Sequence, residues 1–208
     1  MENKPIKPEN FFKTACYFEG SLIFIAVVLG WIADINPFEN IHFSENAVIY
    51  GLFATLPLLL MFLAMEQIKM PSIQKIRRLL IESLGSSMHQ YNWADFFILA
   101  AIAGISEEIL FRGMIQPWIE NSWGYTTGLI ASNILFGLVH AVTPLYAVLA
   151  TIVGIYLALC MDYSGERNLL IPIVTHAAYD FLAFMVIIKS YRSTLKIKPD
   201  QDKQNPSK

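Results

Sequence analysis

The chain has 208 residues, of which 55% are hydrophobic and only 15% are charged, with a net charge of −2. A soluble domain carries about 25% charged residues and a smaller apolar share, so the composition excludes an ordinary soluble fold and indicates an integral membrane protein. The small net charge gives no reason to expect nucleic acid as a partner, and two cysteines exclude a disulfide framework.

Six segments approach the roughly 20 apolar residues that an α-helix needs to cross a bilayer. The 41 residues from 121 to 161 contain no Asp, Glu, Lys or Arg, which is enough for two helices, and Pro144 is the expected break between them. The predicted spans are 17–35, 46–65, 93–118, two helices within 121–161, and 169–188. The sequence therefore predicts an all-α, polytopic membrane helix bundle with about six transmembrane helices.

The basic residues predict how this bundle is oriented. With the N-terminus inside the cell, 13 of the 15 Lys and Arg residues fall in inner segments, whereas Arg167 lies outside and Arg112 within a span. The positive-inside rule then places both termini in the cytoplasm. We expect a multi-pass protein in the inner membrane of a prokaryotic cell, in contact with the lipid bilayer.

Two polar segments adjoin the membrane spans. Residues 66–92 are expected to be a cytoplasmic connector with a basic amphipathic helix, which either lies on the inner leaflet or packs on the bundle. The tail 196–208 is polar, so we expect it to be disordered. One integral membrane domain then covers residues 1–195, and its motif-bearing core is at about 93–188.

The third predicted span contains three ionisable residues where a membrane helix normally has none. A charge near the bilayer centre costs about 2.5–3.5 kcal/mol, so such side chains face protein or a water-filled cavity. Glu108 and Arg112 lie four residues apart and therefore share one helix face, where each stabilises the charge of the other. Glu107 points about 100° away and is less neutralised. It is therefore the candidate general base.

Two later spans contribute further polar side chains at the same helical spacing. Phe136 and His140 are one turn apart in the fourth span, and His176 and Asp180 are one turn apart in the sixth. Each feature alone has a structural explanation: a histidine can join two helices, the charged pair of the third span can be a bridge, and Phe136 can be core packing. Their joint placement on three helices instead predicts one polar cavity.

The three helices must come close together for such a cavity to form. Small residues on the spans, Gly104 and Ala177 among them, would permit a close approach. At about 1.5 Å per residue, Glu107 lies near the middle of its span and His140 lies closer to the inner surface. Helix tilt or shifted helix bounds are therefore needed to bring the two together.

The three motifs, in this order, resemble those of the CAAX-processing and bacteriocin-processing membrane protease family, which includes the type II CAAX prenyl endopeptidases. They read Glu107-Glu108-Ile109-Leu110-Phe111-Arg112, Phe136-Gly137-Leu138-Val139-His140 and His176-Ala177-Ala178-Tyr179-Asp180. The resemblance covers about residues 93–185. Asp180 stands where the best-known eukaryotic members carry Asn. The resemblance implies an intramembrane endopeptidase.

The resemblance also implies glutamate-dependent hydrolysis without a cofactor. Glu107, assisted by His140, would activate a water molecule, and His176 with Asp180 would stabilise the oxyanion of the attacked carbonyl. The substrate would be a peptide or protein at the membrane, either prenylated or a peptide precursor. The implied residues are Glu107, Glu108, His140, His176 and Asp180 for catalysis, and Arg112 and Phe136 for shaping the site.

Three other interpretations remain open at this point. Glu107, His140 and His176 could be ligands of a zinc ion. Glu108 would then be the base, although the positive charge of Arg112 opposes a dication. Ionisable residues in membrane helices also build proton relays, which would indicate an ion-coupled carrier. Finally, a non-catalytic immunity or interaction protein could keep the same fold.

Overall fold

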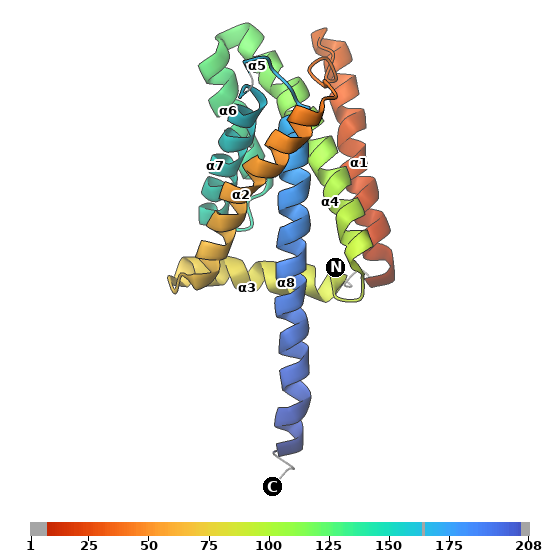
Figure 1. Cartoon of the computed structure of the whole chain (residues 1–208), viewed down its shortest axis with the longest axis vertical. Coiled ribbons are helices and arrows are strands. Elements are labelled where there is room, and N and C mark those ends of the chain that lie inside the picture. Colours follow the sequence, from red (N-terminus) through yellow and green to blue (C-terminus); the bar gives the residue numbers. More distant parts are fainter. Residues whose placement is uncertain (1–7, 164, 205–208) are drawn as a thin grey trace, which may run out of the picture.

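The structure is a computed structural model that describes residues 8–163 and 165–204. Within these residues every regular element is a helix, as Figure 1 shows. In chain order the elements are α1 (Pro8–Ala33), α2 (Glu45–Gln67), α3 (Pro71–Met88), α4 (Trp93–Glu108), the π-helix η1 (Ile109–Ile115), α5 (Gln116–Trp123), α6 (Tyr125–Val139), α7 (Pro144–Met161) and α8 (Leu170–Gln204). The predicted all-α membrane bundle is confirmed.

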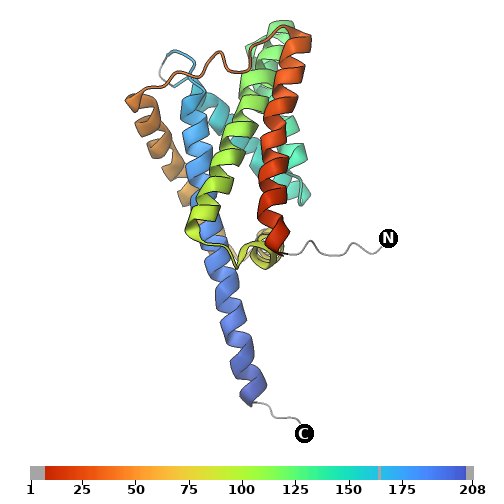
Figure 2. The same ribbon diagram turned by 90° about the vertical axis from the view of Figure 1, so that its right-hand side faces the viewer.

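The helices run along the bundle except for α3, which lies across one end (Figures 1 and 2). α1 begins at the end where α3 lies, α8 runs past it, and α5 lies at the opposite end. This is the arrangement expected when both ends of the chain are on one side of the membrane. The cytoplasmic assignment of that side stays a prediction, and Lys4, Lys7 and Lys208, which contribute to it, lie outside the described residues.

Four helices of the described chain are long and apolar enough to cross a membrane: α1, α2, α7 and α8. α6 is apolar but has only 15 residues. The two helices predicted within 121–161 are α6 and α7, and α7 begins at Pro144, where the break was expected. The third predicted span is the continuous helical stretch of α4, η1 and α5. Six membrane crossings therefore stay a prediction.

The first turn of α4 determines where this helix begins. Asn92 accepts hydrogen bonds through Oδ1 from the backbone N–H groups of Ala94 (2.8 Å) and Asp95 (3.4 Å). The Asp95 carboxylate accepts one in return from the backbone N–H of Asn92 (2.9 Å). This reciprocal capping satisfies amides that a helix start leaves free. Glu107, 14 residues after Trp93, consequently lies about 21 Å along the helix axis.

α4 and α8 approach each other through small residues. A Cβ atom on Gly104 would lie 2.8 Å from the backbone nitrogen of Ala177, so the two helices are about as close as their backbones allow. The close approach predicted from these two residues is confirmed. It brings the end of α4, with Glu108, against His176 on α8.

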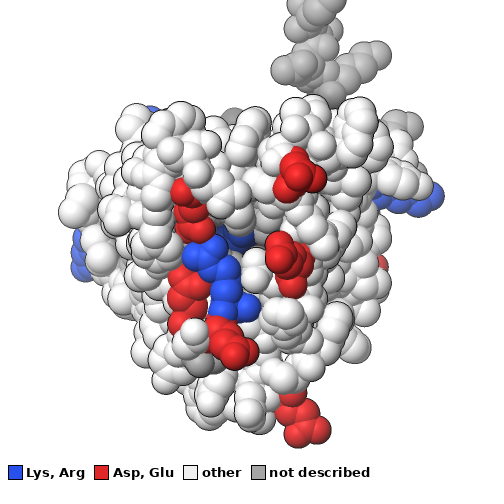
Figure 3. All heavy atoms as spheres, turned by 90° about the horizontal axis from the view of Figure 1, so that it is seen from above, with Lys and Arg blue, Asp and Glu red and all other residues white. Residues whose placement is uncertain are grey.

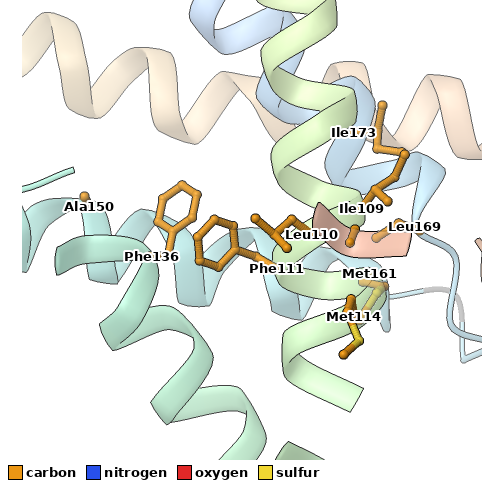
Figure 4. Packing of buried hydrophobic residues seen from close by; sticks show 10 residues of the cluster. Ile109, Leu110, Phe111, Met114, Phe136, Ala150, Met161, Leu169 and Ile173 are labelled. Atoms are coloured by element: carbon orange, nitrogen blue, oxygen red, sulfur yellow. The ribbon is translucent and has the colours of Figure 1, made fainter. Parts of the chain in front are cut away.

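The apolar core next to the site is built around η1. Ile109, Leu110, Phe111 and Met114 are buried there, and Figure 4 shows Ile109 near Leu169 and the Phe111 ring pointing toward α6. In a membrane this packing gains van der Waals contact, because the lipid outside is as apolar as the side chains inside. The core therefore holds η1 in one position by close packing.

α3 has the amphipathic pattern predicted for the connector. Ile73 and Ile76 are buried, whereas Lys75 and Arg78 are exposed. The buried face packs against α8 and, less extensively, α1. This contact agrees with a helix packed on the bundle, while its contact with the inner leaflet stays a prediction.

α8 is longer than the predicted sixth span. It begins at Leu170 and continues to Gln204, so the backbone of residues 196–204 is helical where a disordered tail was predicted. A helix extends from a stable segment at little cost, because each added residue forms one more hydrogen bond. The prediction for residues 205–208 lies outside the described residues.

Candidate active site

Glu108 and His176 form the buried centre of the site. Oε1 of Glu108 accepts hydrogen bonds from Nδ1 of His176 (2.8 Å) and from Nη1 of Arg112 (2.9 Å). The side chains of Glu108 and Arg112 are both 0% exposed, and a carboxylate can be ionised at such a place only with a charged partner. The hydrogen bond also fixes the imidazole of His176 with Nδ1 as the donor, which leaves Nε2 for other contacts.

The guanidinium of Arg112 has partners on two further helices. Nη2 donates to Oδ1 of Asn133 on α6 and to the carbonyl oxygen of Gly154 on α7, both at 2.8 Å. Its Cζ lies 4.5 Å from the ring centre of Phe136, which is a cation–π contact. Arg112 therefore joins the end of α4 to α6 and α7.

Asn133 and Gly154 are residues of this cluster that the sequence analysis missed. Asn133 is fully buried, and its Nδ2 donates to the carbonyl oxygen of Leu129 (2.7 Å). A Cβ atom on Gly154 would lie 2.6 Å from Oδ1 of Asn133 and 3.0 Å from Nη2 of Arg112, so only glycine fits. The available signal for Asn133 was a polar amide inside an apolar span. Gly154 had no such signal, because its role depends on a neighbouring helix.

The segment that carries Arg112 is a π-helix. η1 follows directly on Glu108, within the span predicted over 93–118, for which α-helical spacing was assumed throughout. π-helical turns are rare and frequently occur at functional sites. The wider turn changes the direction in which the side chains after Glu108 point, so α-helical spacing could not predict the neighbours of Arg112.

Glu107 and His140 face each other beside this buried cluster. Oε2 of Glu107 lies 3.4 Å from Nε2 of His140. The other ring nitrogen, Nδ1, lies 2.8 Å from the carbonyl oxygen of Phe136, to which it can only donate. In the neutral imidazole Nε2 is then an acceptor, like the carboxylate oxygen opposite it. Two facing acceptors require a proton donor, either a second proton on the ring or a water molecule.

The short length of α6 explains how His140 meets Glu107. α6 ends at Val139, and the hairpin of α6 and α7 turns back before it reaches the level of α3 in Figures 1 and 2. His140 directly follows this short helix and therefore lies at the depth of Glu107. Counting along a full-length span had placed His140 too close to the inner surface.

Phe136 contacts both histidines of the site. Its ring centre lies 4.3 Å from that of His140 and 6.1 Å from that of His176. It also packs edge-on against Phe111, as Figure 4 shows. Phe136 is therefore a core residue, as the core-packing explanation predicted. Its ring also limits the movement of both imidazoles.

A cavity of about 540 Å³ opens in front of these side chains. Most of its lining is apolar, and its polar wall includes four of the predicted catalytic residues: Glu107, His140, His176 and Asp180. Glu108 and Arg112 do not line the cavity. Nε2 of His176 faces Oδ2 of Asp180 at 3.6 Å, which is longer than a hydrogen bond. Of the carboxylates in the predicted set, Glu107 and Asp180 are thus accessible from the cavity and Glu108 is behind it.

The cavity wall also contains Glu19 of α1, which the sequence analysis did not assign to the site. The first span was predicted over 17–35, which put Glu19 at a polar end. α1 instead begins at Pro8, so Glu19 lies 11 residues inside the helix. The signal that could have identified it was the ionisable side chain itself, next to an apolar stretch.

The geometry also bears on the zinc alternative. Within residues 8–163 and 165–204, no group of three His, Cys, Asp or Glu side chains is placed to hold a metal ion. Nδ1 of His140 and Nδ1 of His176 both have protein acceptors. These contacts do not decide between the alternatives, because a metal-ligating histidine also donates its other ring N–H to a protein acceptor. The zinc alternative therefore stays a prediction.

A separate ion-pair network lies at the end of the bundle opposite α3. Arg167, which precedes α8, donates to Glu120 of α5 (2.7 Å) and to Asp162, which follows α7 (3.0 Å). Figure 3, which views this end, shows basic side chains flanked by acidic ones. None of the three residues lines the cavity. The network joins the ends of three helical elements.

Residues 89–182 match the family model described as type II CAAX prenyl endopeptidase Rce1-like. This segment, 94 of the 208 residues, is similar to that family. The match contains all three motifs and runs from just before α4 into α8, and it confirms the family predicted from the motifs. At the family level the match supports a CAAX-type membrane protease, and the four long apolar helices support an integral membrane protein. No curated protein and no solved structure matched the chain.

Proposed function

We propose that this chain is a glutamate-type endopeptidase that cleaves membrane-associated peptides with a water molecule activated by Glu107 and His140. The observation that carries the proposal is the pair of facing acceptors, Oε2 of Glu107 and Nε2 of His140, at 3.4 Å on the wall of a cavity. A water molecule beside both atoms could donate one hydrogen to each of them. Its oxygen would then present a lone pair to a substrate in the cavity.

In the proposed reaction Glu107 takes a proton from the water molecule while His140 keeps the water oriented. The water oxygen bonds to the carbonyl carbon of the peptide, and the carbonyl oxygen becomes an oxyanion. The C–N bond then breaks, and the proton held by Glu107 moves to the leaving amine. General acid–base catalysis of this kind contributes typically about 10²–10⁴-fold in rate.

His176 is the proposed donor to the oxyanion. Its Nδ1–H is engaged by Glu108, so a protonated Nε2 is the atom that can donate toward the cavity. A preorganised donor of this kind is typically worth about 3–4 kcal/mol of transition-state stabilisation. Asp180, opposite Nε2, favours the protonated imidazole. This role differs from that of an Asn, because an ionised carboxylate cannot itself donate to the oxyanion.

Glu108 and Arg112 are proposed to act through His176. They lie behind the cavity wall, where Glu108 holds the imidazole and Arg112 holds Glu108. Phe136 restrains the same ring from its other side. The mainly apolar lining of the cavity suits lipid-anchored peptides, including prenylated peptides and peptide precursors. The proposed setting is the inner membrane of a prokaryotic cell, with both termini in the cytoplasm.

A cleavage assay on purified protein in detergent tests this function. Wild type, Glu107→Gln and His140→Ala are incubated with a pool of membrane-anchored and prenylated peptides, with and without a zinc chelator. Glu39→Gln removes an equivalent carboxylate from an exposed position outside the cavity and is the matched control. We expect cleavage by wild type and Glu39→Gln, a loss of at least about 100-fold in Glu107→Gln, and no effect of the chelator.

Other outcomes would favour the other interpretations. Loss of cleavage with the chelator would indicate the zinc mechanism. Undiminished cleavage by Glu107→Gln would refute the role of this glutamate. A proton flux through liposomes that contain the protein, without any cleavage product, would indicate an ion-coupled carrier. A cellular phenotype that survives Glu107→Gln would indicate a non-catalytic protein.

A further inference from the structure

Glu19 is a carboxylate in the cavity that the proposed reaction does not use. It lies on α1, outside the residues that match the family, and it lines the same cavity as Glu107 and His140. Its Oε2 atom is buried and has no hydrogen-bond partner among the described residues. Burying a carboxylate oxygen without a partner is unfavourable, so a ligand that supplies a partner would bind there with a gain in free energy.

The other carboxylates on the cavity wall each lie within 4 Å of a basic side chain, although Oε2 of Glu107, like that of Glu19, has no hydrogen-bond partner among the described residues. Glu66 pairs with Arg77 (2.7 Å), Glu107 faces His140 (3.4 Å) and Asp180 faces His176 (3.6 Å). Glu19 has no ion pair with any described residue. Its carboxylate can therefore form an ion pair with a molecule that enters the cavity. The chemistry that complements an unpaired carboxylate is a cation with N–H donors.

The position of Glu19 relates it to the scissile bond. α1 and α4 both begin at the end of the bundle where α3 lies (Figures 1 and 2). Glu19 is about 16 Å along α1 and Glu107 about 21 Å along α4, so Glu19 lies roughly one helical turn closer to that end. An extended peptide covers about 3.3–3.6 Å per residue. Along the bundle axis, the offset between Glu19 and Glu107 therefore corresponds to about two residues of an extended peptide or fewer, and both side chains line the same cavity.

The surroundings of Glu19 favour a long basic side chain. Phe11, Ala15, Leu99 and Ala103 line the cavity near α1 and α4 and are apolar. Lys and Arg place a hydrocarbon stem along such a surface and a charged group at its end. An apolar wall that ends in an unpaired carboxylate complements both parts of that side chain.

We propose that Glu19 is a specificity-determining residue that binds a Lys or Arg side chain of the peptide substrate, within about two residues of the scissile bond. The inference rests on the proposed function, since it concerns the substrate of the same site. It adds a substrate class, peptides with a basic residue beside the cleaved bond. The proposal also implies that α1, which lies outside the matched residues, contributes to substrate specificity.

A binding experiment tests the charge preference without requiring cleavage. Fluorescent prenylated heptapeptides carry either Lys or norleucine at each position in turn, because norleucine keeps the stem and removes the charge. Their affinities are measured on intact protein in detergent in the Glu107→Gln background, which prevents turnover. We expect the best Lys peptide to bind on the order of tenfold to 100-fold more tightly than its norleucine partner.

Variants at Glu19 separate recognition from structure. Adding Glu19→Gln should reduce the Lys-to-norleucine affinity ratio to about one, and Glu19→Lys should favour peptides with Glu at the same position. Asp34→Asn is the matched control: it removes one carboxylate from an exposed site just after α1, and Asn tolerates its positive φ of 56°. This control should leave the ratio unchanged. Size-exclusion profiles in detergent establish that each variant is folded.

The outcomes distinguish this inference from the proposed function. If no peptide shows a charge preference, or if Glu19→Gln keeps the preference, the inference is wrong even when cleavage depends on Glu107. If the preference is present and depends on Glu19 but no peptide is cleaved by wild type, the binding inference stands and the peptidase function fails.

Discussion

His176 and Arg112 donate to the same oxygen of Glu108, at 2.8 Å and 2.9 Å. One buried carboxylate oxygen therefore holds both an imidazole at the cavity wall and a guanidinium behind it. This arrangement separates the two neighbouring glutamates by role, because Glu107 faces the cavity and Glu108 faces the protein interior.

Glu108→Gln should destabilise the protein, because it leaves the fully buried Arg112 without a counter-charge. Breaking a buried pair by removing one partner typically costs about 3–5 kcal/mol. Thermal unfolding of the detergent-solubilised protein measures this effect. The double variant Glu108→Gln/Arg112→Met should lose less than the two single variants combined, since both remove the same interaction. Additive losses would contradict a direct pair.

Arg112→Lys should reduce both stability and cleavage although it keeps the positive charge. A lysine cannot donate at the same time to Glu108, Asn133 and the Gly154 carbonyl in the planar geometry that the guanidinium provides. Arg167→Lys, in the separate network outside the cavity, is the matched control. It should cost at most about 1 kcal/mol because its ion pairs are partly exposed. Equal effects of the two substitutions on cleavage would argue against a special role for Arg112.

Gly154→Ala should disrupt the cluster through a single methyl group. The added Cβ atom would lie 2.6 Å from Oδ1 of Asn133, so α7 must move away from α6 or Arg112 must lose a partner. Overpacking of this kind typically costs about 1–3 kcal/mol. Gly20→Ala on α1 has nothing within 4 Å of the added atom and should be neutral or slightly stabilising. Unfolding temperatures of the two variants, measured side by side, provide the comparison.

Phe136→Leu should lower cleavage more than it lowers stability. Leucine keeps an apolar side chain in the core but removes the ring that contacts both histidines and Arg112. Phe181→Leu on α8 is the control, because this ring stacks edge-on with Phe97 and does not line the cavity. We expect about tenfold slower cleavage for Phe136→Leu, equivalent to about 1.4 kcal/mol, and little change for the control. A parallel loss of stability and cleavage in Phe136→Leu would indicate core packing alone.

Much of the fold followed from local features of the sequence. Apolar length identified α1, α2, α7 and α8, and Pro144 marked the start of α7, because a membrane helix satisfies its own backbone hydrogen bonds and needs only length and apolarity. The same reasoning missed the continuation of α8 to Gln204, since a polar composition does not prevent a helix from extending.

The motif spacing by itself also determined which residues share a helix face and which glutamate pairs with Arg112. Only the tertiary structure decided the rest of the site: the π-helix η1, the contacts of Arg112 with Asn133 and Gly154, the depth of His140 and the inclusion of Glu19. The physical reason is that spacing along one helix follows from its own geometry, whereas distances between helices depend on where each begins and ends. They depend equally on how closely small residues such as Gly104 and Gly154 let the backbones approach.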